Sequence, residues 1–185
     1  MTPASIIFLD IDGVLNSVES RMSAPASHTL IEASKPTPTL VARLARLVAV
    51  TGSALVLSST WRLSTSERCE VAAALSAGGI EPLFGDTPVT EDPVGGAADR
   101  AAEIRRWLAE SAPATLVAWL ALDDLDLHGW CPELGDDLHF QLVDDAVGLS
   151  EANVDSAIAK LRQQQSRSDP KTAERADPEP GAHAP

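Results

Sequence analysis

Basic and aromatic residues are both scarce in this chain of 185 residues. It contains 14 Lys and Arg against 27 Asp and Glu, which gives a formal net charge of −13. Proteins bind nucleic-acid backbones through basic side chains that displace counterions, so this balance argues against a nonspecific nucleic-acid binder. Aromatic residues make up 4% of the chain and tyrosine is absent, so we expect a core built from Leu, Val, Ile and Ala.

Cysteine and long apolar segments are also rare. Cys69 and Cys131 are far apart and form no C-x-x-C pair, which indicates two free thiols in a reducing compartment. The N-terminus MTPAS lacks the basic segment of a secretory signal. The longest apolar run, residues 112–122, is too short to cross a bilayer and contains Pro113. We therefore expect a cytoplasmic protein that does not contact a membrane.

Four short apolar runs predict buried strands of a parallel sheet, because each is rich in β-branched or large aliphatic residues. They are Ser5–Leu9, Ala54–Leu57, a segment within residues 114–122, and residues 138–143. Amphipathic patterns between them predict helices over residues 38–51, 65–77, 99–110 and 151–163, capped by Thr37, Ser64 (with Glu67) and Ser150. Alternating strands and helices predict a three-layer α/β domain with helices on both faces of the sheet.

The last residues differ in composition from the rest. Residues 163–185 contain four prolines and almost no large apolar side chains. Such a segment buries too little surface to offset its ordering entropy, so we expect one domain over residues 1–162 and a disordered tail over 163–185. Residues 16–35 are poorly patterned and are expected to form a long loop with some local structure.

Polar side chains follow the predicted strands, at the edge of a parallel sheet where ligands bind. Asp10 and Asp12 follow the first strand, and Gly13 allows a sharp turn there. One carboxylate can attack phosphorus once a cation screens the phosphoryl oxygens, and a second can transfer protons. Taken alone, such a pair is more often two ordinary turn aspartates.

Three further groups complete the set. Ser58 and Ser59 follow the second strand, where a hydroxyl could hold a phosphoryl oxygen or simply cap the next helix. Arg100 lies near the start of the third helix, as a phosphate ligand or a surface arginine. Asp123 and Asp124 follow the third strand, where adjacent carboxylates suit Mg²⁺ or form an acidic loop. Each group alone is weak evidence for a phosphoryl-transfer site, but the four groups in this order along the chain are strong evidence for one.

In this order the sequence resembles the haloacid dehalogenase (HAD) superfamily of phosphotransferases. FLDIDGVLN resembles its first motif, LVLSSTWR its second and LALDDLD its fourth, with Arg100 where the third places Lys or Arg. The resemblance covers about residues 6–161. The ending LVDDAVGLSEANVDSAIAKL, the Trp after the second motif and R-x-x-E-I-x-x-W-L resemble the HAD domains grouped with Swiss Army Knife RNA-repair proteins.

The resemblance implies a division of roles among the carboxylates. Asp10 would be the nucleophile and form an aspartyl-phosphate, and Asp12 would be general acid and then base. An Asp at position 12 resembles the phosphatases of the superfamily. Mg²⁺ would be held by Asp10, the backbone carbonyl of Asp12, and Asp123, with Asp124 ligating or orienting.

The resemblance also implies phosphate ligands and an open site. Ser59 would bind the phosphoryl group, with Ser58 as a rival one residue away. Arg100 would hold phosphoryl oxygens in its planar fork, with Arg105 as a rival on the same helix. About forty residues separate the first two motifs and residues 78–98 are also few, so neither segment holds a full cap domain.

We therefore predict a magnesium-dependent phosphatase. Its substrate is a phosphomonoester, small or macromolecular. The resemblance favours nucleic-acid ends, whereas the charge of −13 argues against strong backbone binding. The alternative is a non-catalytic interaction module with the same fold. A response-regulator receiver is disfavoured, because receivers place the acidic pair after the first strand and the phosphorylated Asp after the third.

Overall fold

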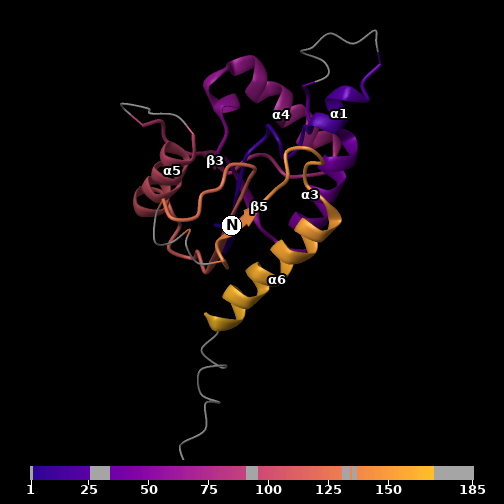
Figure 1. Ribbon diagram of the computed structural model, residues 1–185. Coiled ribbons are helices and arrows are strands. Elements are labelled where there is room, and N and C mark those ends of the chain that lie inside the picture. The colour runs from indigo at the N-terminus through magenta and orange to yellow at the C-terminus, as the bar shows by residue number, and fades with distance from the viewer. Residues whose placement is uncertain (1, 26–33, 91–95, 131–133, 135–136, 169–185) are drawn as a thin grey trace, which may run out of the picture.

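Five parallel strands form the central sheet of the computed structural model, which describes residues 2–25, 34–90, 96–130, 134 and 137–168 (Figure 1). The strand order is β3-β2-β1-β4-β5. The chain fills one side of β1 first and then crosses to the other side, so the order reverses beside β1. In open α/β sheets such a reversal marks the ligand site. The strands are β1 (Ser5–Leu9), β2 (Ala54–Leu57), β3 (Gly85–Asp86), β4 (Ala118–Asp123) and β5 (Phe140–Leu142).

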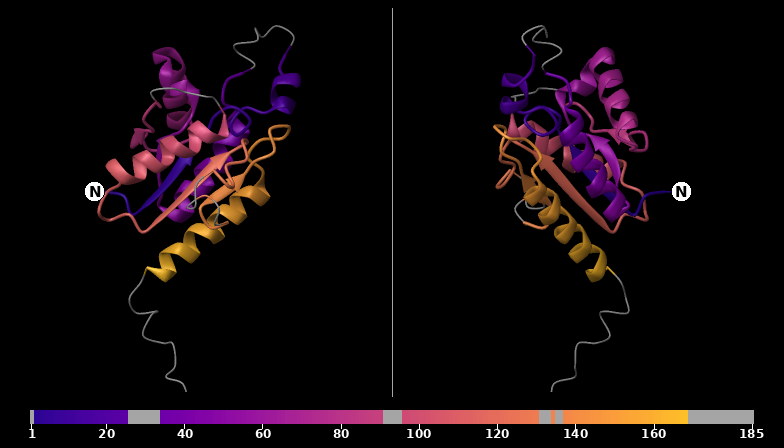
Figure 2. Two further views of the ribbon diagram at one scale, coloured as in Figure 1. Left: turned by 60° about the vertical axis from the view of Figure 1, so that its left-hand side comes forward. Right: turned by 90° about the vertical axis from the view of Figure 1, so that its right-hand side faces the viewer.

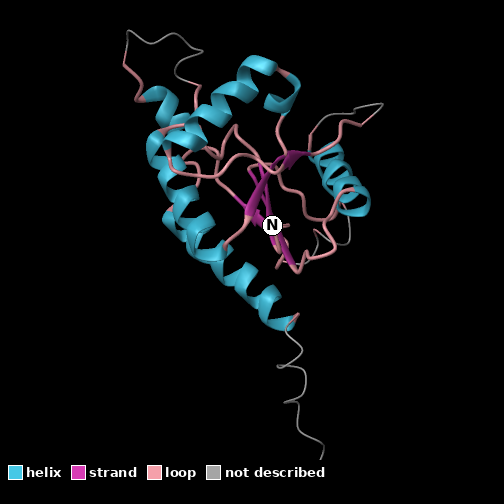
Figure 3. Ribbon diagram, turned by 180° about the vertical axis from the view of Figure 1, so that it is seen from behind, coloured by secondary structure: helices cyan, strands magenta, loops and turns pink. Residues whose placement is uncertain are grey.

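Helices cover both faces of this sheet, as Figures 2 and 3 show. Helices α3 (Pro38–Thr51), α4 (Thr65–Ala77) and α6 (Glu151–Arg167) pack on one face, and α5 (Ala97–Glu110) packs on the other. Neighbouring residues of β1 alternate between the two resulting cores, because successive strand side chains point to opposite faces. Ile7 and Leu9 belong to the first core, and Ile6 and Phe8 to the second. The predicted three-layer α/β fold is confirmed.

Most predicted elements lie close to their expected positions. Strands β1 and β2 have the predicted bounds, and so does α3, which begins at Pro38 and ends at Thr51. Gly52 caps it in a left-handed conformation with φ of 65°. Thr37 makes no side-chain cap bond, whereas Ser64 accepts a hydrogen bond from the Glu67 backbone N–H. Helix α5 begins two residues earlier than predicted, β4 ends one residue beyond the apolar run of residues 114–122, and β5 is shorter than the run of residues 138–143.

The predicted end of the last helix was wrong, because α6 continues to Arg167 instead of ending near residue 163. Gln164 explains the difference. It is 6% exposed, its Oε1 accepts from the Trp119 backbone N–H at 3.0 Å, and its Nε2 donates to the Trp119 carbonyl at 2.9 Å. One side-chain amide therefore bonds the backbone of β4 at its start and ties the last helical turns to the sheet. Residues 169–185 lie outside the described residues.

Three short elements were not predicted. Helix α1 (Val18–Met22) lies in the segment expected to be a long loop with some local structure, and a reciprocal capping box of Ser17 and Ser20 starts it. The 3₁₀ turn η1 (Thr60–Leu63) follows β2, and β3 has only two residues. Elements of two to five residues carry no hydrophobic period, so sequence patterns do not detect them.

No cap domain is built from the described residues between the first two motifs, which form α1 and α3 only. The described residues between β3 and α5 form no helix or strand. In the part of the chain that the structure describes, no helix has the length and apolar character needed to cross a bilayer.

Candidate active site

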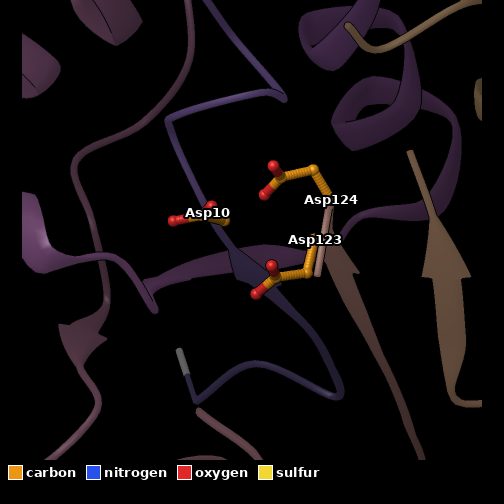
Figure 4. A group of neighbouring side chains, drawn as sticks. All are labelled: Asp10, Asp123 and Asp124. Atoms are coloured by element: carbon orange, nitrogen blue, oxygen red, sulfur yellow. The ribbon is translucent and has the colours of Figure 1, made fainter. Parts of the chain in front are cut away.

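Three carboxylates meet at the carboxyl ends of β1 and β4 (Figure 4). Leu9 pairs with Leu122, and the backbone N–H of Asp10 donates to the Leu122 carbonyl at 3.1 Å. This register places Asp10 beside Asp123, the last residue of β4, with Asp124 next along the chain. Each of the three aspartates offers an oxygen within 4.8 Å of the others.

Burial makes this cluster electrostatically unusual. Asp10 is 4% exposed and Asp123 is 1% exposed. Burial raises the pKa of Asp10, although Arg100 and Ser59 partly offset the effect. Burial and then repulsion from Asp10 raise the pKa of Asp123 to about 8, and the same two causes raise the pKa of Asp124 to about 6. The negative charge here is thus poorly compensated within the protein.

Arg100 is the cation that faces the cluster. It is 8% exposed, and its Nη1 lies 3.0 Å from Asp10 Oδ1 and 2.6 Å from Asp123 Oδ2. Arg105, its rival on α5, is exposed. Five helical positions turn a side chain about 140° away from the first, so the two arginines cannot share one face. The structure therefore brings Arg100, and not Arg105, to the carboxylates.

Of the two candidate serines, Ser59 contacts the cluster. Its side chain hydrogen-bonds Asp10, and its Oγ also accepts from the Trp61 backbone N–H at 3.5 Å. Ser58 is equally buried at 1% exposure, but its Oγ has no hydrogen-bond partner among the described residues. The turn η1 begins directly after Ser59 and sets this hydroxyl toward Asp10.

Asp12 lies apart from the three-carboxylate cluster and is exposed. Its Oδ1 accepts a hydrogen bond from Asn16 Nδ2 at 2.8 Å, and its Oδ2 accepts from Trp61 Nε1 at 2.9 Å. The carboxyl group, which we expected to act as general acid and then base, is thus held by two side-chain donors. A role of its backbone carbonyl in metal binding stays a prediction.

Gly13 lets the first motif turn beneath Asp124. Its φ of 73° favours glycine, and a Cβ at this position would lie 2.6 Å from Asp124 Cγ. Any other residue here would push Asp124 out of the cluster or distort the turn.

A buried ion pair next to the site holds the backbone of Ser59, and the sequence patterns did not predict it. Arg62 contacts Glu103 of α5, and their side chains are 5% and 7% exposed. Arg62 Nη1 also donates to the Ser59 carbonyl at 2.6 Å, and its Nε to the Thr87 carbonyl at 3.0 Å. Glu103 lies three positions after Arg100, so one face of α5 holds both residues. The three-residue spacing of Arg100 and Glu103 was the sequence feature that could have indicated Glu103 as a residue of the site.

The fold and site together define an α/β domain whose strand ends gather acidic residues, a serine and an arginine in the order of the HAD motifs. Residues 6–154 match the family described as the HAD domain in Swiss Army Knife RNA repair proteins. The chain belongs to this family, as the sequence motifs suggested. Neither a curated protein nor a solved structure matches the chain.

Proposed function

We propose that the chain is a magnesium-dependent phosphatase that hydrolyses phosphomonoesters through an aspartyl-phosphate on Asp10. The observation that carries the proposal is the environment of Asp10. This buried carboxylate lies at the sheet's switch point, hydrogen-bonded by Ser59 and paired with Arg100. The family contains HAD domains, which supports phosphoryl chemistry as the activity. The strand order β3-β2-β1-β4-β5 also differs from the 2-1-3-4-5 order of receiver-type folds.

The reaction has two steps, each with a proton to place. A carboxylate oxygen of Asp10 attacks phosphorus while the bond to the leaving oxygen breaks, and Asp12 gives that oxygen its proton. Water then attacks the phosphorus of the aspartyl-phosphate, and Asp12 accepts the proton of that water. Inorganic phosphate leaves and Asp10 is restored. Ser59 and Arg100 would hold the phosphoryl oxygens during both steps.

The donor set fits Mg²⁺. Three carboxylates with oxygens within 4.8 Å of one another offer hard oxygen ligands, and one arginine does not neutralise them. Asp10, Asp123 and Asp124 would hold the ion, together with the backbone carbonyl of Asp12. When bound, Mg²⁺ supplies positive charge that lowers the repulsion between Asp10 and the phosphoryl oxygens.

The surroundings of the site favour a terminal phosphate over a long phosphodiester chain. An open pocket of about 620 Å³ beside Asp124 is lined in part by Asp144 and Asp145. These acidic side chains would repel further backbone phosphates. The family's link to RNA repair supports phosphorylated nucleic-acid ends as one substrate class, with nucleotides and other phosphomonoesters as the others. The exposed free thiol of Cys69 fits a reducing compartment, and we infer a cytoplasmic location.

Asp10→Asn is the experiment that tests this function. The purified wild-type protein should hydrolyse p-nitrophenyl phosphate with Mg²⁺ and lose activity with EDTA. Asp10→Asn should abolish turnover, because an amide is not a nucleophile toward phosphorus. Asp126→Asn, an exposed change in the loop after β4, is the matched control and should keep activity.

The same assay separates the alternatives. Activity that persists in Asp10→Asn would rule out Asp10 as the nucleophile. Mg²⁺ binding without turnover of nucleotides, sugar phosphates, phosphopeptides and 3′- or 5′-phosphorylated oligonucleotides would favour a non-catalytic module. Release of phosphate from the oligonucleotides alone would identify nucleic-acid ends as the substrate.

Ser59→Ala and Ser58→Ala should have different effects on activity. We expect Ser59→Ala to lower kcat/KM by about 10- to 100-fold, because it removes a donor directed at Asp10 and the phosphoryl group. Ser58→Ala removes a hydroxyl with no partner among the described residues, so activity should stay within about twofold. Steady-state kinetics of both variants provide the measurement. A larger loss in Ser58→Ala would make Ser58 the phosphate ligand.

A further inference from the structure

Asp12 is an exposed aspartate whose two carboxylate oxygens are each held by a different buried side chain. Asn16 donates to Oδ1 at 2.8 Å and Trp61 donates to Oδ2 at 2.9 Å. An exposed aspartate with no partner samples several rotamers. Two donors from separate parts of the chain restrict this carboxylate to one orientation.

Trp61 is a rigid donor because its ring belongs to the core. It is 7% exposed and packs in the hydrophobic cluster between the sheet and helices α3, α4 and α6. The indole Nε1–H is a donor only, so it cannot change roles as the carboxyl group gains or loses a proton. Packing of the apolar ring therefore fixes the one polar atom that reaches Asp12.

Asn16 is fixed by its own hydrogen bonds. It is fully buried, and its Oδ1 accepts from the Gly13 backbone N–H at 3.1 Å. Its Nδ2 donates to the Ser34 carbonyl as well as to Asp12. With the amide oxygen bonded to Gly13, the NH₂ group must face Asp12, so the orientation of this donor is also set.

We propose that Trp61 is a positioning residue that holds Asp12 in the orientation needed to protonate the leaving oxygen, with Asn16 holding the second carboxylate oxygen. The inference rests on the proposed phosphatase function. General-acid catalysis requires the acid within hydrogen-bond reach of the leaving oxygen, and small misplacements are costly. Each oxygen of Asp12 accepts one of these two N–H bonds and keeps another lone pair for the transferred proton.

The dependence of rate on leaving-group basicity tests this role. kcat/KM should be measured with wild type and Trp61→Phe on a series of phosphates from p-nitrophenyl to phenyl. A leaving group that is a weak base needs little protonation, whereas phenolate needs more. We expect Trp61→Phe to lower kcat/KM for phenyl phosphate by about 10- to 100-fold, and for p-nitrophenyl phosphate by less than about threefold. The slope of log(kcat/KM) plotted against leaving-group basicity should therefore be steeper for Trp61→Phe than for the wild type.

Two further variants separate positioning from packing. Site-specific replacement of Trp61 by 3-benzothienylalanine keeps the ring size and removes the N–H donor, so it should steepen the plot as Trp61→Phe does. Trp119→Phe, a matched change on β4 against Phe8 and His139, should leave the slope unchanged.

The outcomes have distinct meanings. An equal loss on all substrates, or a benzothienyl variant with the wild-type slope, would overturn the inference and leave Trp61 a packing residue. Faster turnover in Trp61→Phe would also overturn it, because the indole would then hold Asp12 away from the leaving group. If the wild type shows no turnover that Asp10→Asn abolishes, the proposed function is overturned, and this inference with it.

Discussion

Replacing Glu103 with alanine is expected to lower the free energy of unfolding by about 3–5 kcal/mol. The variant would leave the Arg62 guanidinium buried without its charged partner, since the two side chains are 5% and 7% exposed. Burying an unpaired charge is far more costly than losing an exposed ion pair. The hydrogen bonds from Arg62 to the Ser59 and Thr87 carbonyls remain, but they supply no negative charge.

Glu110→Ala is the matched control for this prediction. Glu110 pairs with Arg106 on the same helix, where the side chains are 59% and 47% exposed. Its loss should cost about 0–1 kcal/mol. Chemical denaturation of both variants in the same buffer gives the comparison. Equal costs for the two variants would show that the buried pair does not stabilise the fold. Activity should fall in Glu103→Ala as well, because Arg62 holds the backbone of Ser59.

The acidic cluster could be predicted from the sequence because it depends on strand ends. Ser5–Leu9 and the run ending at Leu122 are strongly apolar, and parallel strands bring their carboxyl ends to one edge. The residues that follow, Asp10 and Asp123, therefore had to meet. The same reasoning predicted the fold, since it needs only the periodic patterns of apolar residues in strands and helices.

The choice between Ser58 and Ser59 could not be made in this way. Strand alternation alone would place Ser58 level with Asp10, because Leu57 pairs with Leu9. The chain leaves the strand after Leu57 and turns into η1, which brings Ser59 to Asp10 instead. A four-residue 3₁₀ turn has no sequence pattern strong enough to predict this change of direction.

Contacts between distant segments were also beyond the sequence. Trp61 reaches Asp12 across 49 positions, and Gln164 reaches Trp119 across 45. Each partner has an ordinary local role: a core indole, a turn aspartate, a polar residue on a helix. Only the packing of the layers shows which polar atoms meet, and this is why the helix end and the support of Asp12 were missed.

The second large effect concerns how pH changes the stability of the metal-free protein. Burial and repulsion from Asp10 raise the pKa of Asp123 from 3.8 to about 8. Between these values the folded protein keeps a proton on Asp123 that the unfolded chain releases. The folded state thus binds more protons, so its stability must fall as pH rises from about 4 to about 8. Asp10 and Asp124, whose pKa values burial also raises, act with the same sign.

We expect the wild-type protein in EDTA to lose roughly 1–3 kcal/mol of unfolding free energy between pH 6 and pH 8. Asp123→Asn should flatten this dependence and abolish turnover, because it removes the titrating carboxylate together with a metal ligand. Glu81→Gln, which removes an exposed charge before β3, should keep the wild-type slope. Added Mg²⁺ should restore wild-type stability most at pH 8, where the carboxylates are ionised, and restore Asp123→Asn less. A wild-type stability that rises from pH 6 to pH 8 in EDTA would contradict the idea that the cluster is short of positive charge, since carboxylates with raised pKa values make stability fall over this range.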